Sequence, residues 1–454
     1  MKVEDLTATN PMYNSNAVKW EFFLRSFSGG DEYRNGNYLL KYIKESDAEY
    51  EKRIDLTPLD NHCKNVINIY SSFIWRLPPT RNFGSQDNDP IIQQFLNDAD
   101  MDGRNFNSFM RDAQAWSGVY GHVWVLVDKP KSEAVNRAQE LVDEVRPYVT
   151  LITPENVLDW RYERGSNGRY QLTMLKVREW ASADESFYRV WGQDEIASYH
   201  VKGDEAELVE VVDNPLGRVP AVCLYANRSP VRGIGISDIT DVAYMQKAIY
   251  NELSEIEQLI RITNHPSLVM GQNTDASAGA GGVIVADDSE EIKPYLLQPN
   301  GGNLDAIRAS ITDKVEAINR MTHMGAVRAT EAQTKSGVAL QTEFQLLNAK
   351  LSEKADLLEL AEEQVWDLFS QWQDTNNDIK VDYPDSFNLR DYGTELEFLQ
   401  RARASGVTST TFNQGVDKAI AELVLGDEDL VAAISEIETS TRRLGEFAPQ
   451  LEAV

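Results

Sequence analysis

Four carboxylates at Asp287, Asp288, Glu290 and Glu291 are the side chains of this sequence best suited to chemistry. A carboxylate cluster can hold a divalent metal ion, as in metal-dependent nucleases. These four follow an apolar strand pattern in a predicted turn, without a partnered lysine or histidine, and short acidic runs are commonly solvated turns. A nuclease is therefore one hypothesis for this chain, and a solvated turn is the other.

Other motifs give no support to catalysis. Residues 98–103 open like a calcium loop, but the twelfth position, which requires a bidentate glutamate, is Phe109, so a turn between helices is predicted. The glycines of 279–282 precede a strand pattern, no phosphate-binding loop occurs, and the histidines lack metal-ligand spacing. Cys63 and Cys223 lie in apolar patterns and are predicted to be buried free thiols. We predict no catalytic residue, metal or cofactor.

The charge balance argues against tight binding of nucleic acid through its phosphates. The chain has 454 residues, with 72 acidic and 44 basic side chains and a net charge of −28. Such a charge keeps a polyanion off the surface and also favours solubility. No run of eighteen apolar residues occurs and the N-terminus lacks a signal-peptide pattern. We therefore expect a folded protein made in the cytosol, without a membrane partner.

The element with the clearest pattern is one long amphipathic helix from residue 338 to about 374. It is preceded by Ser336 and Gly337 and ends near Asn376 and Asn377. At 1.5 Å per residue it spans about 55 Å, which is long for a globular helix and is expected to organise an assembly. Its apolar positions recur every three or four residues. They are Leu340, Phe344, Leu347, Leu351, Ala355, Leu358, Ala361, Val365, Leu368 and Trp372.

The remaining chain predicts an α+β, predominantly helical fold. Residues 1–130 are expected to be mostly helical, at 20–24, 38–40, 65–75 and 106–116, before a buried strand at 123–128. Period-two patterns from 148 to 225 predict an antiparallel sheet. Two helices at 237–264 and 303–321 then flank a small insert with short strands at 267–270, 283–285 and 292–297. Shorter helices are predicted at 396–403, 412–424 and 429–437.

With this order of parts, the chain resembles the portal proteins of tailed bacteriophages over most of its length. Several short stretches look like those of the family. They are Tyr50-Glu51-Lys52-Arg53, Arg76-Leu77-Pro78-Pro79, Tyr120-Gly121-His122, Val127-Asp128, Pro154-Glu155-Asn156-Val157, Asn214-Pro215-Leu216-Gly217-Arg218-Val219-Pro220 and Ser336-Gly337-Val338-Ala339-Leu340.

The resemblance implies a ring, usually of twelve subunits, at the portal vertex of the virion capsid. Double-stranded DNA would be packaged and ejected through it. The large terminase subunit, a head-tail adaptor, and the major capsid and scaffolding proteins would be its partners. It also implies a wing (1–236 with 337–390), stem helices (237–265 and 303–321), a clip (266–302), a tunnel loop (322–336) and a crown (391–454).

Two groups of candidate site residues follow from this division. Residues of the tunnel loop would face the DNA channel: His323, Arg328, Glu331 and Lys335. Residues of the clip would dock the packaging motor: Thr274, Asp275, Ser277, Asp287, Asp288, Glu290 and Glu291. Between 319 and 336 the charges sum to +2, so the loop either touches DNA phosphates transiently or is a polar connector. A ring-forming capsid scaffold or tail adaptor that conducts no DNA is the alternative function, beside the nuclease.

Overall fold

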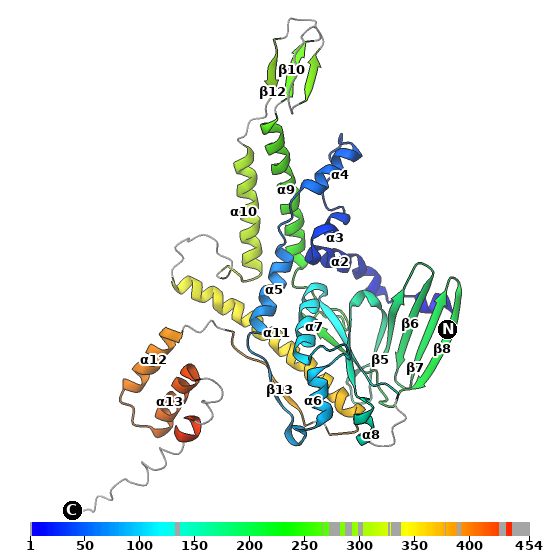
Figure 1. The fold of residues 1–454 in the computed structure, drawn as a ribbon, viewed down its shortest axis with the longest axis vertical. Coiled ribbons are helices and arrows are strands. Elements are labelled where there is room, and N and C mark those ends of the chain that lie inside the picture. The colour runs from blue at the N-terminus through cyan, green and yellow to red at the C-terminus, as the bar shows by residue number, and fades with distance from the viewer. Residues whose placement is uncertain are drawn as a thin grey trace, which may run out of the picture. The chain divides into compact units, whose positions relative to one another are not determined.

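The computed structural model describes residues 2–131, 137–265, 267–271, 282–286, 293–297, 303–325, 327, 337–376, 378–387, 392–425 and 433–437 (Figure 1). The chain divides into two units, Met1–Phe387 and Asn388–Val454. Helices and antiparallel sheets both contribute, so the expected mixed class is confirmed.

The first unit contains most of the helices and strands. In chain order they are α1 (Val3–Thr7), α2 (Pro11–Ser28), α3 (Gly30–Asn35), α4 (Asp47–Leu56), α5 (His62–Ile74), β1 (Thr80–Asn82), η1 (Gly84–Gln86), α6 (Pro90–Asn97), α7 (Phe106–Tyr120), β2 (His122–Asp128), α8 (Arg137–Val142), β3 (Tyr148–Ile152), η2 (Pro154–Asn156), β4 (Val157–Arg164), β5 (Tyr170–Ala181), β6 (Glu185–Gly192), β7 (Glu195–Lys202), β8 (Glu205–Asp213), β9 (Ala221–Tyr225), α9 (Thr240–Asn264), β10 (Ser267–Gly271), β11 (Val283–Ala286), β12 (Tyr295–Leu297), α10 (Asn303–Met321), α11 (Gly337–Trp372) and β13 (Lys380–Asp382). The second unit contains α12 (Tyr392–Ala404) and α13 (Thr410–Val424).

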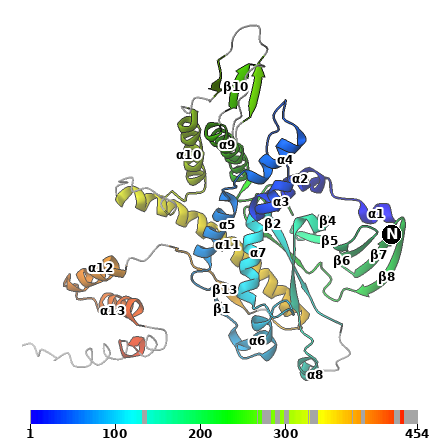
Figure 2. The same ribbon diagram turned by 45° about the horizontal axis from the view of Figure 1, so that its top comes forward.

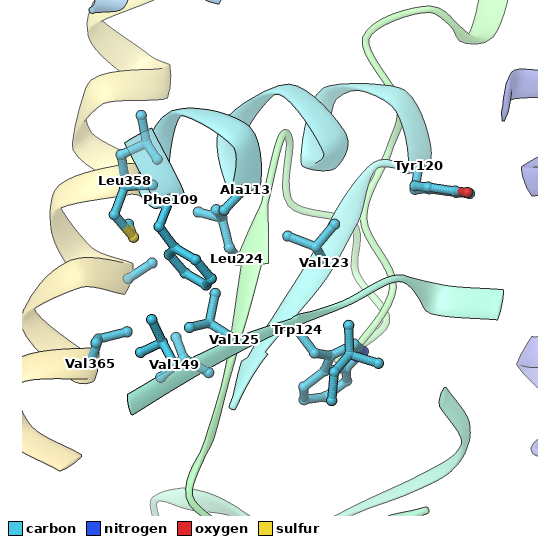
Figure 3. Packing of buried hydrophobic residues seen from close by; sticks show 14 of the residues in the cluster. Phe109, Ala113, Tyr120, Val123, Trp124, Val125, Val149, Leu224, Leu358 and Val365 are labelled. Atoms are coloured by element: carbon cyan, nitrogen blue, oxygen red, sulfur yellow. The ribbon is translucent and has the colours of Figure 1, made fainter. Parts of the chain in front are cut away.

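A three-stranded antiparallel sheet of order β3-β2-β9 lies at the centre of the main core. Helices α7 and α11 both contact β2 and β9. Figure 3 shows Val123 and Val125 of β2 directed toward the side chains of these helices, while Trp124 points the other way. The central strand is buried along nearly its whole length, which explains why its sequence is a continuous apolar run instead of an alternating one.

The second sheet is a five-stranded antiparallel meander of order β4-β5-β6-β7-β8. One face contributes Trp191 and Ile196 to the main core. The other face packs Tyr199 and Ala197 against Leu6 of α1 in a smaller cluster. Successive side chains of these strands point to opposite faces, which gives the period-two pattern of the sequence, and the prediction of an antiparallel sheet here is confirmed.

The long helix is confirmed as α11, which has 36 residues and therefore a length of about 54 Å. Its described apolar positions from Leu347 to Leu368 are nearly all inaccessible to solvent, and they belong to the main core of the same chain. The subunit's own core therefore buries this part of the seam, and the expected role of the helix in an assembly stays a prediction.

Three details of the sequence prediction differ from the structure. Residues 38–40 are not helical: the chain bends there, and its carbonyls accept hydrogen bonds from Asn251 and Tyr50. Strand β3 pairs with β2 instead of joining the meander. Strand β4 was not predicted, and it forms the first strand of that meander.

The helix, insert, helix pattern is confirmed as α9, three short strands and α10. Helices α9 and α10 lie side by side, and the sheet of order β11-β10-β12 follows at their adjoining ends (Figures 1 and 2). Strand β10 pairs in parallel with β11 and antiparallel with β12. We call α9 and α10 the stem and this sheet the tip sheet.

A close backbone approach sets the start of the stem. A Cβ atom on Gly235 would lie 2.0 Å from the carbonyl oxygen of Gly121, and Gly121 has a positive φ of 95° at the end of α7. Any side chain at Gly235 would therefore separate the two segments. This contact brings the chain that leads into α9 against the end of α7.

Burial of the α11 seam predicts a contrast between two leucines on the same helix. Leu358 is 1% exposed and Leu360 is 42% exposed. Leu358→Asp should lower the free energy of unfolding by about 4 kcal/mol, because it places an unpaired charge in the core. Leu360→Asp should change it by less than about 0.5 kcal/mol. Chemical denaturation followed by circular dichroism measures both, and equal losses would contradict the assigned seam.

Candidate functional site

The base of the stem is held by a buried ion pair. Lys354, in the middle of α11, places its Nζ 2.6 Å from both carboxylate oxygens of Asp238, two residues before α9 begins. The two side chains are 3% and 2% exposed. Asp238 also accepts a hydrogen bond of 2.8 Å from the amide of Asn227. The pair therefore joins the longest helix to the start of the stem.

Burial and pairing act in opposite directions on Lys354. Removal from water lowers the pKa of this ammonium group, and the charge and hydrogen bonds of Asp238 oppose that shift. The Nζ atom also donates to the carbonyl of Ala226 at 3.3 Å and lies 5.5 Å from the ring centroid of Tyr70. These partners satisfy the ammonium group and account for its burial.

The two stem helices are also joined to each other and to the core by polar contacts. Lys314 of α10 donates to Glu252 of α9 at 2.6 Å, and Ser310 donates to the same carboxylate at 2.8 Å. The hydroxyl of Tyr70 on α5 donates to the carbonyl of Thr322 at 2.9 Å. The pair of helices is thus fixed at the end where α10 meets the core.

Helix α10 ends in a left-handed cap formed by His323. This residue has a φ of 56°, its N–H bonds the carbonyl of Arg320, and the N–H of Met324 bonds that of Asn319. Met324 is fully buried. The two bonds constitute a Schellman motif. His323, a predicted channel residue, therefore has a structural role in the described chain, and its place in a channel stays a prediction.

The other predicted site residues lie outside the described part of the chain. In the tunnel loop these are Arg328, Glu331 and Lys335, and in the clip they are Thr274, Asp275, Ser277, Asp287, Asp288, Glu290 and Glu291. Beside the loop, a Cβ atom on Gly325 would lie 2.8 Å from the carboxylate of Glu343, so the segment after α10 passes close to α11.

The tip sheet exposes apolar side chains from both of its outer strands. Their exposed fractions lie between 42% and 61%. They are Val283, Ile284, Val285, Tyr295, Leu296 and Leu297. A cluster of this kind on a small sheet is typical of a protein–protein contact.

Sequence reasoning missed the buried charges of α11, although they have a sequence signal. Lys354 lies three residues after Leu351, and Glu362 lies four residues after Leu358, so both occupy positions of the apolar stripe. A charge in such a stripe requires a buried partner. The sequence does not identify the partner, because Asp238 is more than one hundred residues away.

The acidic turn that resembles a calcium loop is engaged in ion pairs. Asp98 accepts a hydrogen bond from Arg146 at 2.9 Å, and Asp100 accepts one from Arg104 at 2.6 Å. In the described residues, no group of three or more histidine, cysteine or acidic side chains is placed to hold a metal ion. Cys63 and Cys223 are free thiols, as predicted, though only Cys63 is fully buried. None of the described helices is long and apolar enough to cross a membrane.

Residues 28–412 match the sequence model of a family of phage portal proteins. Because this match covers well over half of the sequence, the chain belongs to that family, described as phage portal protein, SPP1 Gp6-like. The family is structural and not enzymatic. No significant match occurs among curated protein sequences.

Solved structures similar to this chain come from gene transfer agent particles. A chain of the virion of the native particle is 9% identical with a TM-score of 0.44, and the match covers 78% of this chain and 89% of that one. A chain of the neck of the empty particle is 8% identical with a TM-score of 0.46, covering 83% and 94%. A chain of the native neck is 10% identical with a TM-score of 0.42, covering 80% and 89%. The family assignment rests on the sequence match.

The buried ion pair predicts a contrast between two lysines one turn apart on α11. Lys354→Met leaves Asp238 buried without a cation, so the free energy of unfolding should fall by about 3 to 5 kcal/mol. Lys350→Met is the control: Lys350 is 26% exposed, and its loss should cost about 1 kcal/mol or less. In a thermal-unfolding series, Asp238→Asn combined with Lys354→Met should recover part of the loss. Similar effects of the two lysine variants would contradict a special role for Lys354.

Proposed function

We propose that this chain is the subunit of a ring-shaped portal, with twelve copies as the family resemblance implies. The ring lies at the capsid vertex of a virion and conducts double-stranded DNA during packaging and ejection. The observation that carries the proposal is the family match across residues 28–412. The proposal retains the division into wing, stem, clip, tunnel loop and crown that the resemblance implies.

The tip sheet supports assembly through the clip. Two of its three strands are edge strands, and both expose apolar side chains. A ring brings a neighbouring copy to each side of every tip, so one heterologous contact repeated around the axis buries this surface in every subunit. Isolated subunits would leave it in water.

The charges of the stem support passage of DNA without tight binding. Helix α9 has four acidic and two basic side chains, and α10 has three of each. Together they have a net charge of −2, so they provide no continuous basic surface on which a duplex would be held. Local cations of the tunnel loop would make the transient phosphate contacts.

The partners of the proposed portal follow from its parts. The clip docks the large terminase subunit during packaging and the head-tail adaptor afterwards, and the wing faces the major capsid and scaffolding proteins. No step requires catalysis by this chain. A ring without an axial opening of duplex width would instead favour the adaptor function.

Exposure of the tip sheet predicts variants that fold but do not assemble. Val285→Lys and Leu296→Lys should leave the melting temperature of the subunit nearly unchanged and should reduce the fraction of rings about tenfold or more, because each buries a charge in the contact. Mass photometry and negative-stain microscopy measure this fraction. Val18→Lys, at a 75% exposed position of α2, is the control. Persistent rings in both tip variants would place the contact elsewhere.

The tunnel loop predicts a salt-dependent effect on DNA. Arg328→Ala combined with Lys335→Ala should leave ring formation unchanged and alter the length of DNA retained in filled proheads. The difference should shrink at higher ionic strength, where the wild-type contact is itself screened. Arg320→Ala is the control, since Arg320 lies on α10 near Glu316 at 3.9 Å. If wild type and double variant retain the same length of DNA at every salt concentration, the loop is only a polar connector.

A further inference from the structure

Strand β8 is the outer edge of the meander. It pairs with β7 on one side, and no described strand pairs with its other side. Its nine residues, Glu205–Asp213, are almost all exposed. A bulge at Val209 interrupts the pairing of β8 with β7, and on either side of it the open edge presents unpaired backbone N–H and C=O groups to which another strand can add.

The face of β8 that continues the α1-covered surface is apolar. Leu208 is opposite Tyr199 and Val211 is opposite Ala197, so each pair shares a face of the sheet. Tyr199 and Ala197 are covered by α1, whereas Leu208 and Val211 are 53% and 46% exposed. On β8 the covered cluster therefore reaches only Ala206, and Leu208 and Val211 lie beyond it.

The opposite face of β8 is acidic. Glu205, Glu207 and Glu210 are paired with Lys202, His200 and Ser198 of β7 and lie on one face. Lys202 Nζ lies 2.7 Å and His200 Nε2 3.4 Å from the carboxylate of Glu185. Glu205 and Glu207 consequently form no ion pair with any described residue. Glu210 bonds Lys131, which shows that a lysine can reach this row.

We propose that β8 is a docking edge for an extended segment of another protein in which apolar residues alternate with lysine or arginine. The segment adds as a sixth strand, its apolar side chains cover Leu208 and Val211, and its cations neutralise the row of glutamates. Period-two alternation presents the two kinds of side chain to opposite faces at once. This proposal does not depend on the assembly or the DNA-conducting function of the chain.

Charge complementarity selects the partner. A second copy of β8 placed antiparallel would bring glutamates opposite glutamates, which is destabilising. Nucleic acid would be repelled by the same row. A strand that alternates apolar and basic residues matches both faces of β8, so we infer that the occupant is a protein segment different from β8.

The test uses the full-length protein and labelled synthetic peptides. A peptide that alternates valine and lysine should bind in fluorescence anisotropy and protect the β8 amides from hydrogen exchange. A peptide that alternates valine and glutamate, and one with the valine and lysine order scrambled, should bind about tenfold more weakly or worse. Affinity for the first peptide should fall as salt rises.

Variants locate the binding at the edge. Leu208→Lys with Val211→Lys places cations on the apolar face and should weaken binding about tenfold. Glu205→Gln with Glu207→Gln should weaken binding and reduce its salt dependence. Val18→Lys is the exposed-site control and should bind as wild type does. Unchanged melting temperatures confirm that each variant is folded.

Results of three kinds would overturn the proposal. One is no binding of the valine–lysine peptide, or equal binding of the valine–glutamate peptide. Another is unchanged affinity and unchanged β8 protection in the Leu208→Lys, Val211→Lys variant. Another is self-association of the wild type that this variant abolishes, since that result would mean that a second copy of the chain binds to the β8 edge.

Discussion

The contact between Lys354 and Asp238 is the constraint on which the position of the stem depends. A buried ion pair contributes little net stability compared with apolar residues of the same volume, but loss of one partner leaves an uncompensated charge. The core can therefore close only when the segment before α9 brings its carboxylate to the ammonium group of α11. We infer that the pair specifies where α9 begins relative to α11 more than it adds stability.

A second buried charge on α11, that of Glu362, fixes this helix against β1 and the residue after β13. Glu362 lies two turns beyond Lys354 and is fully buried. It accepts hydrogen bonds from Arg81 at 2.5 Å and 3.1 Å, from Tyr383 at 2.7 Å and from Trp366 at 3.0 Å. Arg81 lies on β1 and Tyr383 directly follows β13. One helix thus connects the stem base to the β1-β13 pair, as a helix of 36 residues allows.

The sequence predicted periodic elements well and pairings poorly, for physical reasons. The bounds of α10 and the apolar seam of α11 follow from local periodicity, and the structure confirms both. The partner of β3 depends on a strand more than twenty residues earlier, and the partner of Lys354 lies still farther away, so no local pattern contains either. Of the candidate site residues only His323 is described, and its capping role rests on a left-handed backbone conformation that no sequence periodicity indicates.

The surfaces of the subunit fit an assembly of strongly acidic copies. Each chain has a net charge of −28, so neighbouring copies in the proposed ring would repel one another at low salt. Contacts between copies must then depend on apolar burial, and the tip sheet exposes such side chains on both outer strands. The glutamates of β8 have the opposite effect. They repel further copies of the chain and DNA, so this surface remains available to a basic partner. In the proposed portal, this separation of apolar and acidic surfaces would let the chain assemble with itself at the tip sheet and exclude further copies at β8.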